Sequence, residues 1–226
     1  MALPIKLKNW LHAIFNGSLD LLYPPKCAGC DKMGDGVWCS DCERRVQLLV
    51  APSHIHTLSL NETAQMPVLS ATVFDSPVRE AIHEFKYNGT PALAVPLARY
   101  LVLAWQRVNW SSDLIIPVPL YKRRRQERGY NQSEFLAIEL ARAVKIAINP
   151  NALTRTRNTE QQAHLDAEMR RQNVAEAFAA VPGLVDGKRV LLVDDVLTTG
   201  STLQACALSL LQSGAADVSA ITLARA

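Results

Sequence analysis

Two adjacent carboxylates interrupt the stretch VLLVDDVLTTGST, residues 190–202, between an apolar run and a turn rich in hydroxyl groups. Asp194 and Asp195 stand where we expect a strand of a parallel sheet to end, and such folds bind their ligands at the carboxyl ends of strands. A pair of carboxylates can accept hydrogen bonds from two vicinal sugar hydroxyls, or hold Mg²⁺ directly or through water. An ordinary strand followed by a helix does not explain two acids there, because burying them unpaired is costly.

The turn that follows the acids suits a phosphate group. Gly200 allows a close approach of the backbone, and the helix that we expect to begin near Ser201 directs its positive end at this turn. The hydroxyl groups that can donate to phosphate oxygens belong to Thr198, Thr199, Ser201 and Thr202. Acids for hydroxyls and a turn for phosphate together describe a site for ribose 5-phosphate. A P-loop is excluded, because the chain contains neither GxxxxGKS nor GxxxxGKT.

Four of the five cysteines form two CxxC pairs, Cys27 with Cys30 and Cys39 with Cys42. Each pair lets two thiolates reach one cation from a tight turn, and two pairs complete the four-sulfur shell of a structural zinc ion. The eight residues between the pairs favour a compact knuckle over a longer ribbon. Disulfides and a redox CxxC are the alternatives, which a reducing cytoplasm and the second copy of the motif disfavour.

From residue 68 onward, strand and helix patterns alternate, which predicts a doubly wound, mostly parallel α/β sheet. RVLLVD, residues 189–194, is the clearest strand, because a continuous apolar run is typical of a parallel strand covered on both faces. Further strands are expected at 68–74, 114–119, 174–179 and 218–224, and helices at 77–87, 92–108, 132–146 and from near 201 to 214. We therefore expect an N-terminal helix and zinc knuckle in 1–50, a linker in 51–67 and the α/β domain in 68–226.

The bulk composition fits this division. A chain of 226 residues, 49% of them apolar, can bury a sizeable core. The net charge of +3 is too small to indicate nucleic-acid binding by itself. We find no signal peptide and no apolar run of the roughly 20 residues that cross a bilayer, so we expect a cytoplasmic protein without membrane insertion.

The VLLVDDVLTTGST stretch resembles the phosphoribosyl-pyrophosphate (PRPP) motif of type I phosphoribosyltransferases. IPVPLYKRRRQERGYNQSE, residues 116–134, is similar to their pyrophosphate-loop region, and LTRTRNTEQQAHLDAEMRRQNVAEAF, residues 153–178, to their mobile segment and following strand. With the CxxC pairs and FKYNGT, residues 85–90, the resemblance spans nearly the whole chain. It is that of the ComF family of competence and DNA-utilisation proteins.

The resemblance implies transfer of a phosphoribosyl group from PRPP to a nitrogen acceptor with release of pyrophosphate. The acids would hold the ribose hydroxyls together with Mg²⁺, and the turn would hold the 5-phosphate. In the arginine-rich loop of residues 122–128, Arg128 is the first candidate for pyrophosphate, which guanidinium groups bind in bidentate fashion. Arg157, with Arg155 and Gln162, lies in a segment that would shield a reactive cation from water. His83 and His164 are candidates for a general base, without an assignment.

Three functions remain open at this point. The protein is an active phosphoribosyltransferase on an unidentified base or amine, a sensor of PRPP or nucleotide without turnover, or a partner that handles single-stranded DNA or DNA-uptake proteins. The intact acids and Gly200 favour the first function, although a sensor needs the same pocket. Tyr121 and Tyr130 flank the basic run, and aromatic side chains beside basic ones are typical of single-strand binding.

Overall fold

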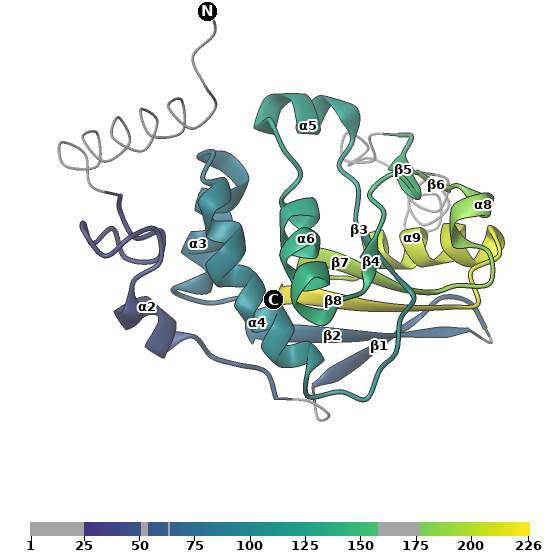
Figure 1. The fold of residues 1–226 in the computed structure, drawn as a ribbon, viewed down its shortest axis with the longest axis horizontal. Coiled ribbons are helices and arrows are strands. Elements are labelled where there is room, and N and C mark those ends of the chain that lie inside the picture. Colours follow the sequence, from purple (N-terminus) through teal and green to yellow (C-terminus); the bar gives the residue numbers. More distant parts are fainter. Residues whose placement is uncertain (1–24, 51–53, 63, 158–176) are drawn as a thin grey trace, which may run out of the picture.

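A mixed sheet of six strands forms the centre of the computed structural model, which describes residues 25–50, 54–62, 64–157 and 177–226. The strand order is β1-β2-β8-β7-β3-β4, and every neighbouring pair is parallel except β1 with β2. The strands are β1 (Ile55–Ser59), β2 (Gln65–Val73), β3 (Leu114–Pro117), β4 (Ala147–Ile148), β7 (Arg189–Leu197) and β8 (Asp217–Arg225). The predicted α/β fold with a mostly parallel sheet is confirmed (Figure 1).

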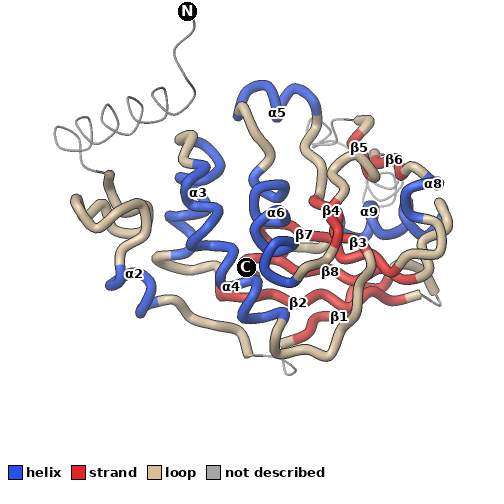
Figure 2. Tube along the Cα trace, viewed as in Figure 1, coloured by secondary structure: helices blue, strands red, loops and turns tan. Residues whose placement is uncertain are grey.

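Helices cover both faces of this sheet (Figure 2). One core joins the sheet to α3 (Val78–Tyr87), α4 (Ala94–Trp105) and α6 (Gln132–Val144), and a short 3₁₀ turn, η1 (Pro91–Leu93), leads into α4. The other core joins the sheet to α9 (Ser201–Gln212). Successive residues of a strand point to opposite faces, so Leu191 and Val193 enter the first core while Val190 and Leu192 enter the second.

Shorter elements complete the described chain. α2 (Ser40–Arg45) follows the first cysteines, α5 (Lys122–Arg128) connects β3 to α6, and α8 (Pro182–Val185) precedes β7. A separate antiparallel ribbon pairs β5 (Leu153–Arg155) with β6 (Phe178–Ala180). This ribbon flanks residues 158–176, so most of the predicted mobile segment lies outside the described residues.

The structure differs from the sequence prediction in two connecting stretches. Residues 55–59, expected in a linker, form the edge strand β1, in which only Leu58 is buried. An edge strand with one buried residue is too polar to produce a strand signal. Residues 122–128, expected as a loop, form α5, which buries none of its side chains and ends at Gly129 with a φ of 82°. A helix without an apolar face leaves no periodic pattern in the sequence.

The ends of other elements shift by a few residues. β6 begins at Phe178, near the end of the strand expected at 174–179, whose first three residues lie outside the described chain. The expected N-terminal helix also lies outside it. Within the described ranges, no helix has both the length and the apolarity to cross a membrane.

Candidate functional site

The two acids lie beside the open end of β3. β3 pairs with β7 only as far as Val193, whereas β8 continues to pair with β7 up to Leu197. Asp194 and Asp195 are therefore still inside a strand, because β7 ends at Leu197, three residues after the end that the sequence predicted. On the side of β3, however, the pairing has already ended, and folds of this kind bind ligands at such carboxyl ends of strands.

Asp194 is held by two donors. The hydroxyl of Ser133, in the first turn of α6, donates to Asp194 Oδ1 at 2.8 Å, and the backbone N–H of Asp195 donates to the same oxygen at 2.9 Å. Burial, and then the charge of the neighbouring Asp195, raise the pKa of the Asp194 carboxyl to about 7. The ligand-free site therefore resists a second negative charge.

Asp195 is held by a cation from another helix. The Lys86 ammonium, in the last turn of α3, lies 2.9 Å from Asp195 Oδ1. Asp195 is only 4% exposed. Its other oxygen, Oδ2, is buried and has no hydrogen-bond partner among the described residues. The carboxylate thus has one engaged oxygen and one oxygen left to accept from a ligand.

The turn after the acids carries several hydroxyl groups. Thr198, Thr199 and Ser201 are exposed and Thr202 is half-buried, and the hydroxyls of Thr199 and Ser201 lie 3.0 Å apart. Gly200 caps α9 with a φ of 80°, so no side chain at that position bonds the first amide groups of the helix. The Ser201 N–H donates to the Thr199 hydroxyl at 3.4 Å, and anion binding by the amide groups of this turn stays a prediction.

Gly200 also touches the β1–β2 hairpin. A Cβ atom at this position would lie 2.6 Å from Leu58 Cδ2, and the Gln204 side chain donates to the Ser59 carbonyl at 2.8 Å. The hairpin therefore packs against the turn at Gly200 and the first turn of α9, so residues 55–59 are part of the fold and not a free linker.

The sequence predicts two arginines, Arg128 and Arg157, for pyrophosphate binding. Among the described residues, the partners of Arg128 are the Gln132 side-chain oxygen, which accepts from its guanidinium, and the ring of Tyr87, 5.4 Å away. Arg157 is exposed and follows β5 at the border of the described chain. Their roles in pyrophosphate binding stay predictions. His83 stacks on Tyr87 with ring centroids 4.8 Å apart, and His164 lies outside the described residues.

Sequence reasoning missed two residues of the carboxylate site, Lys86 and Ser133. Both lie in stretches that carry the family resemblance, FKYNGT and GYNQSE, but neither stretch contains a local feature that identifies its partner. In GYNQSE, the Asn131 side chain accepts a hydrogen bond from the Ser133 N–H and donates one to the Val118 carbonyl. These two bonds hold the start of α6 beside the end of β3. This cap aims the Ser133 hydroxyl at Asp194.

The four N-terminal cysteines converge as predicted. Their sulfur atoms all lie within 4.8 Å of one another, and the pairs Cys27 with Cys42 and Cys30 with Cys39 are 3.6 and 3.7 Å apart. A tetrahedral shell with Zn–S bonds of about 2.3 Å places its sulfurs about 3.8 Å apart, so this geometry fits zinc. All four cysteines are free, which contradicts the disulfide alternative. The Cys42 backbone N–H lowers the pKa of the Cys39 thiol to about 7, whereas burial raises the pKa of the Cys42 thiol.

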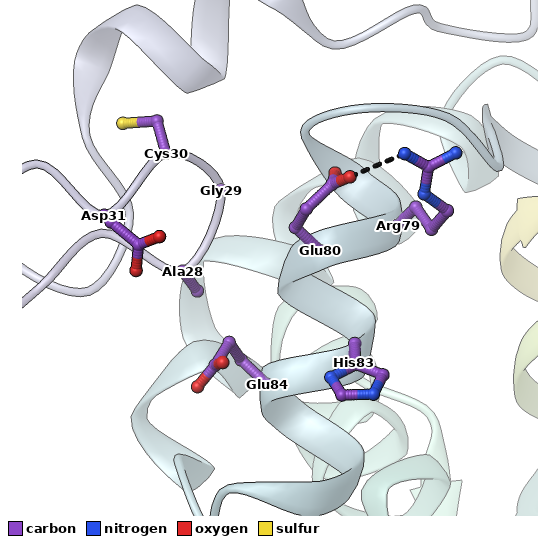
Figure 3. A pocket seen from close by; sticks show the side chains of 8 residues that line it. All are labelled: Ala28, Gly29, Cys30, Asp31, Arg79, Glu80, His83 and Glu84. Carbon is purple, nitrogen blue, oxygen red and sulfur yellow. Dashed lines mark hydrogen bonds and ion pairs between the residues drawn. The ribbon is translucent and has the colours of Figure 1, made fainter.

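The four-cysteine segment, residues 25–50, which we call the zinc module, packs against α3 and α4. The Trp38 indole N–H donates to the Tyr100 hydroxyl of α4 at 3.1 Å. A cavity of about 340 Å³ separates the turn at Gly29 from the side chains of Glu80 and Glu84 on α3 (Figure 3). None of the residues that line this cavity belongs to the carboxylate site.

Comparison with known proteins agrees with these two centres. The phosphoribosyl transferase domain model matches residues 128–226, and the double zinc ribbon domain model matches residues 18–53. The chain is 35% identical over 211 residues to the DNA utilization protein YhgH of Escherichia coli O157:H7, covering 84% of this chain and 92% of that protein. It is 33% identical over 218 residues to competence protein F of Haemophilus influenzae, covering 93% and 94%. Among solved structures, glutamine phosphoribosylpyrophosphate amidotransferase from B. subtilis gives a TM-score of 0.45 at 22% identity, covering 62% of this chain and 30% of that one.

The fold and the matched domains define a protein with a type I phosphoribosyltransferase domain and an N-terminal four-cysteine zinc ribbon. The chain belongs to the ComF family of competence and DNA-utilisation proteins. The matched zinc domain is a ribbon, where the cysteine spacing favoured a knuckle. Among the described residues, the sulfur ligands gather in one group of four, because the fifth cysteine, Cys206, is buried in the core formed with α9.

Proposed function

We propose that the protein binds PRPP in the crevice at the ends of β3 and β7 and transfers its phosphoribosyl group to a nitrogen acceptor, with release of pyrophosphate. The observation that carries this proposal is a carboxylate pair with one unsatisfied oxygen, in the strand that leads to α9, whose N-cap Gly200 has no side chain. Among the described residues, Asp195 Oδ2 is buried without a partner, and three residues further along the chain, at Thr198, exposed hydroxyls begin. A phosphorylated pentose is a ligand whose diol and phosphate would satisfy both ends of this site.

Each part of the chain then has a task in the proposed reaction. Asp194 and Asp195 accept hydrogen bonds from the ribose hydroxyls, and the amides and hydroxyls at 198–202 bind the 5-phosphate. As the bond to pyrophosphate breaks, positive charge develops on the sugar and is stabilised by the nearby carboxylates. Arg128 and Arg157 are proposed to bind the departing pyrophosphate, which requires a change in the side-chain partners that Arg128 has in this structure.

The carboxylate pair also fits Mg²⁺. Hard cations of this kind take oxygen ligands from one or two carboxylates and from substrate phosphates, and Asp195 Oδ2 is an oxygen without a partner. When bound, Mg²⁺ would supply positive charge against the phosphates of PRPP. Zinc is given a structural task instead, since its four sulfur ligands leave no open position and the module packs on α3 and α4.

Binding is tested by calorimetry with PRPP and Mg²⁺. The parent should bind, and the double variant Asp194→Asn with Asp195→Asn should lose binding. A control of equal charge change, Asp217→Asn with Glu139→Gln, alters two carboxylates outside the crevice and should retain the affinity of the parent. Equal affinity of the Asp194 and Asp195 double variant would reject the proposal. Turnover is tested separately by pyrophosphate release from PRPP with a panel of bases and amines, and binding without release for any acceptor would favour a sensor.

A second candidate function concerns single-stranded DNA. The relatives are named for DNA utilisation and competence, and α5 exposes a basic surface next to Tyr87, which is 60% exposed and lies under the Arg128 guanidinium. Basic and aromatic side chains together suit unpaired bases. Lys122→Gln and Tyr87→Ala should each weaken oligonucleotide binding, and Lys122→Gln should lower the salt dependence by about one unit. Unchanged binding in both variants would remove this candidate.

A further inference from the structure

Lys86 forms an ion pair with one of the two acids of the carboxylate site. It projects from the last turn of α3, and its ammonium reaches Asp195 Oδ1 at 2.9 Å. The side chains of this pair are 23% and 6% exposed, in contrast to the exposed ion pairs on the surface helices, such as Arg123 with Glu127. In an ion pair with so little exposure, each charge needs its partner, because removal of one side chain leaves the other charge largely buried and uncompensated.

The contact makes the two carboxylates unequal. Asp194 Oδ1 already accepts from the Ser133 hydroxyl and from a backbone N–H, whereas Asp195 receives Lys86 on one oxygen and nothing on the other. A buried acceptor without a donor is rare in folded proteins and marks the place of a missing partner. Asp195 Oδ2 is thus the carboxylate oxygen that most requires a hydrogen-bond donor from a ligand.

We infer that Lys86 is a positioning residue of the site: by holding Asp195 Oδ1, it directs Oδ2 to accept a hydroxyl hydrogen from the ribose of a sugar phosphate. The inference rests on the proposed function, because it takes a phosphorylated pentose as the ligand. Lys86 acts through Asp195 and does not bind the phosphate, which belongs to the turn at Gly200. Its effect is therefore confined to the sugar part of the ligand.

This restriction supplies the test. Dissociation constants of ribose 5-phosphate and of inorganic phosphate are measured by calorimetry at fixed Mg²⁺ for the parent and for Lys86→Met, which keeps most of the apolar stem and removes the charge. The affinity for ribose 5-phosphate should fall about tenfold to a hundredfold, the range of a hydrogen bond to a charged group, while that for inorganic phosphate stays unchanged. Lys86→Arg should restore part of the loss.

Lys188→Met is the matched control. Lys188 stands at the opposite end of β7 and donates to the Leu184 carbonyl, so the same substitution there should leave both affinities unchanged. In an Asp195→Asn background, Lys86→Met should have no further effect on ribose 5-phosphate, because the residue through which Lys86 acts has been altered. If Lys86→Met does not fold, Lys86→Gln takes its place with the same expectations.

The outcomes separate this inference from the proposed function. A parent that binds neither PRPP nor ribose 5-phosphate would overturn the proposed function and this inference with it. A parent that binds both, together with a Lys86→Met variant whose two affinities are unchanged or fall equally, would overturn the inference alone. A Lys86 effect that persists in the Asp195→Asn background would also overturn it.

Discussion

One added methyl group at Gly29 tests how rigidly the zinc module packs on the α/β domain. A Cβ atom at this position would lie 2.7 Å from Pro77 Cβ, 2.8 Å from Cys42 Sγ and 3.0 Å from Trp38 Cζ3. Carbon atoms normally approach no closer than about 3.5 Å. None of these neighbours is the end of a flexible side chain, because Pro77 is a ring at the start of α3 and Cys42 belongs to the metal centre. The module must therefore move as a body in Gly29→Ala.

The expected magnitude follows from two opposing effects. Overpacking of a filled site costs about 1–3 kcal/mol. A Gly→Ala change at a compatible backbone position stabilises by about 0.4–1 kcal/mol, because the unfolded chain loses freedom. The net change in the free energy of unfolding should be a loss of about 1–2 kcal/mol, which lowers the melting temperature by about 2–8 °C for a domain of this size.

Gly183→Ala is the control, since a Cβ atom at Gly183, in α8, meets no atom within 4 Å. This variant should be as stable as the parent or slightly more stable. Both variants are unfolded in urea and by heat at saturating zinc, and their zinc content is measured with a chromophoric chelator. Equal stability of the two variants would refute the reasoning that the turn of the zinc module is tightly packed between Pro77 and Cys42.

Three further predictions concern other parts of the chain. Gly200→Ala should weaken phosphate binding and lower the free energy of unfolding by about 1–3 kcal/mol, because Gly200 has a positive φ and an added Cβ atom would collide with Leu58. In a double-mutant cycle, Leu58→Ala should relieve part of this loss. Cys42→Ser, or chelation of the zinc, should lower the metal content and the melting temperature together, and a variant that retains one zinc per chain would contradict the four-sulfur site. Hydrogen bonds from Arg189 hold the pKa of Asp113 well below its usual range, so this carboxylate stabilises the fold above about pH 4 and less as the pH falls; the difference in melting temperature between the parent and Asp113→Asn should therefore shrink from pH 7 to pH 3.

The helix α3 contacts both the zinc module and the carboxylate site. α3 carries Lys86 in its last turn, and its first residues contact the module through Pro77 and Gly29. The position of Lys86 therefore depends on a helix whose other end rests on the metal centre. Zinc removal is therefore expected to act on the carboxylate site through α3.

The sequence alone identified the candidate ligand groups of both centres. VLLVDDVLTTGST places acids, hydroxyls and a glycine next to one another in the chain, and the CxxC pairs do the same for sulfur ligands, so each set is brought together by local geometry. The continuous apolar run of β7 likewise predicts a central parallel strand. Elements with a one-sided or weak pattern, such as β1 and α5, were missed because exposed surfaces impose no periodicity on their residues.

Only the tertiary structure decided which distant residues complete the site. Lys86 and Ser133 are 109 and 61 positions from their carboxylate partners, and no local rule selects one lysine or serine among many for such a contact. Their placement depends on the register of β3 against β7 and on the packing of α3 and α6 on the same face of the sheet. Sequence patterns specify which residues are buried in each element, while the pairing of separate elements results from packing of the whole core, which brings polar side chains together at its edge.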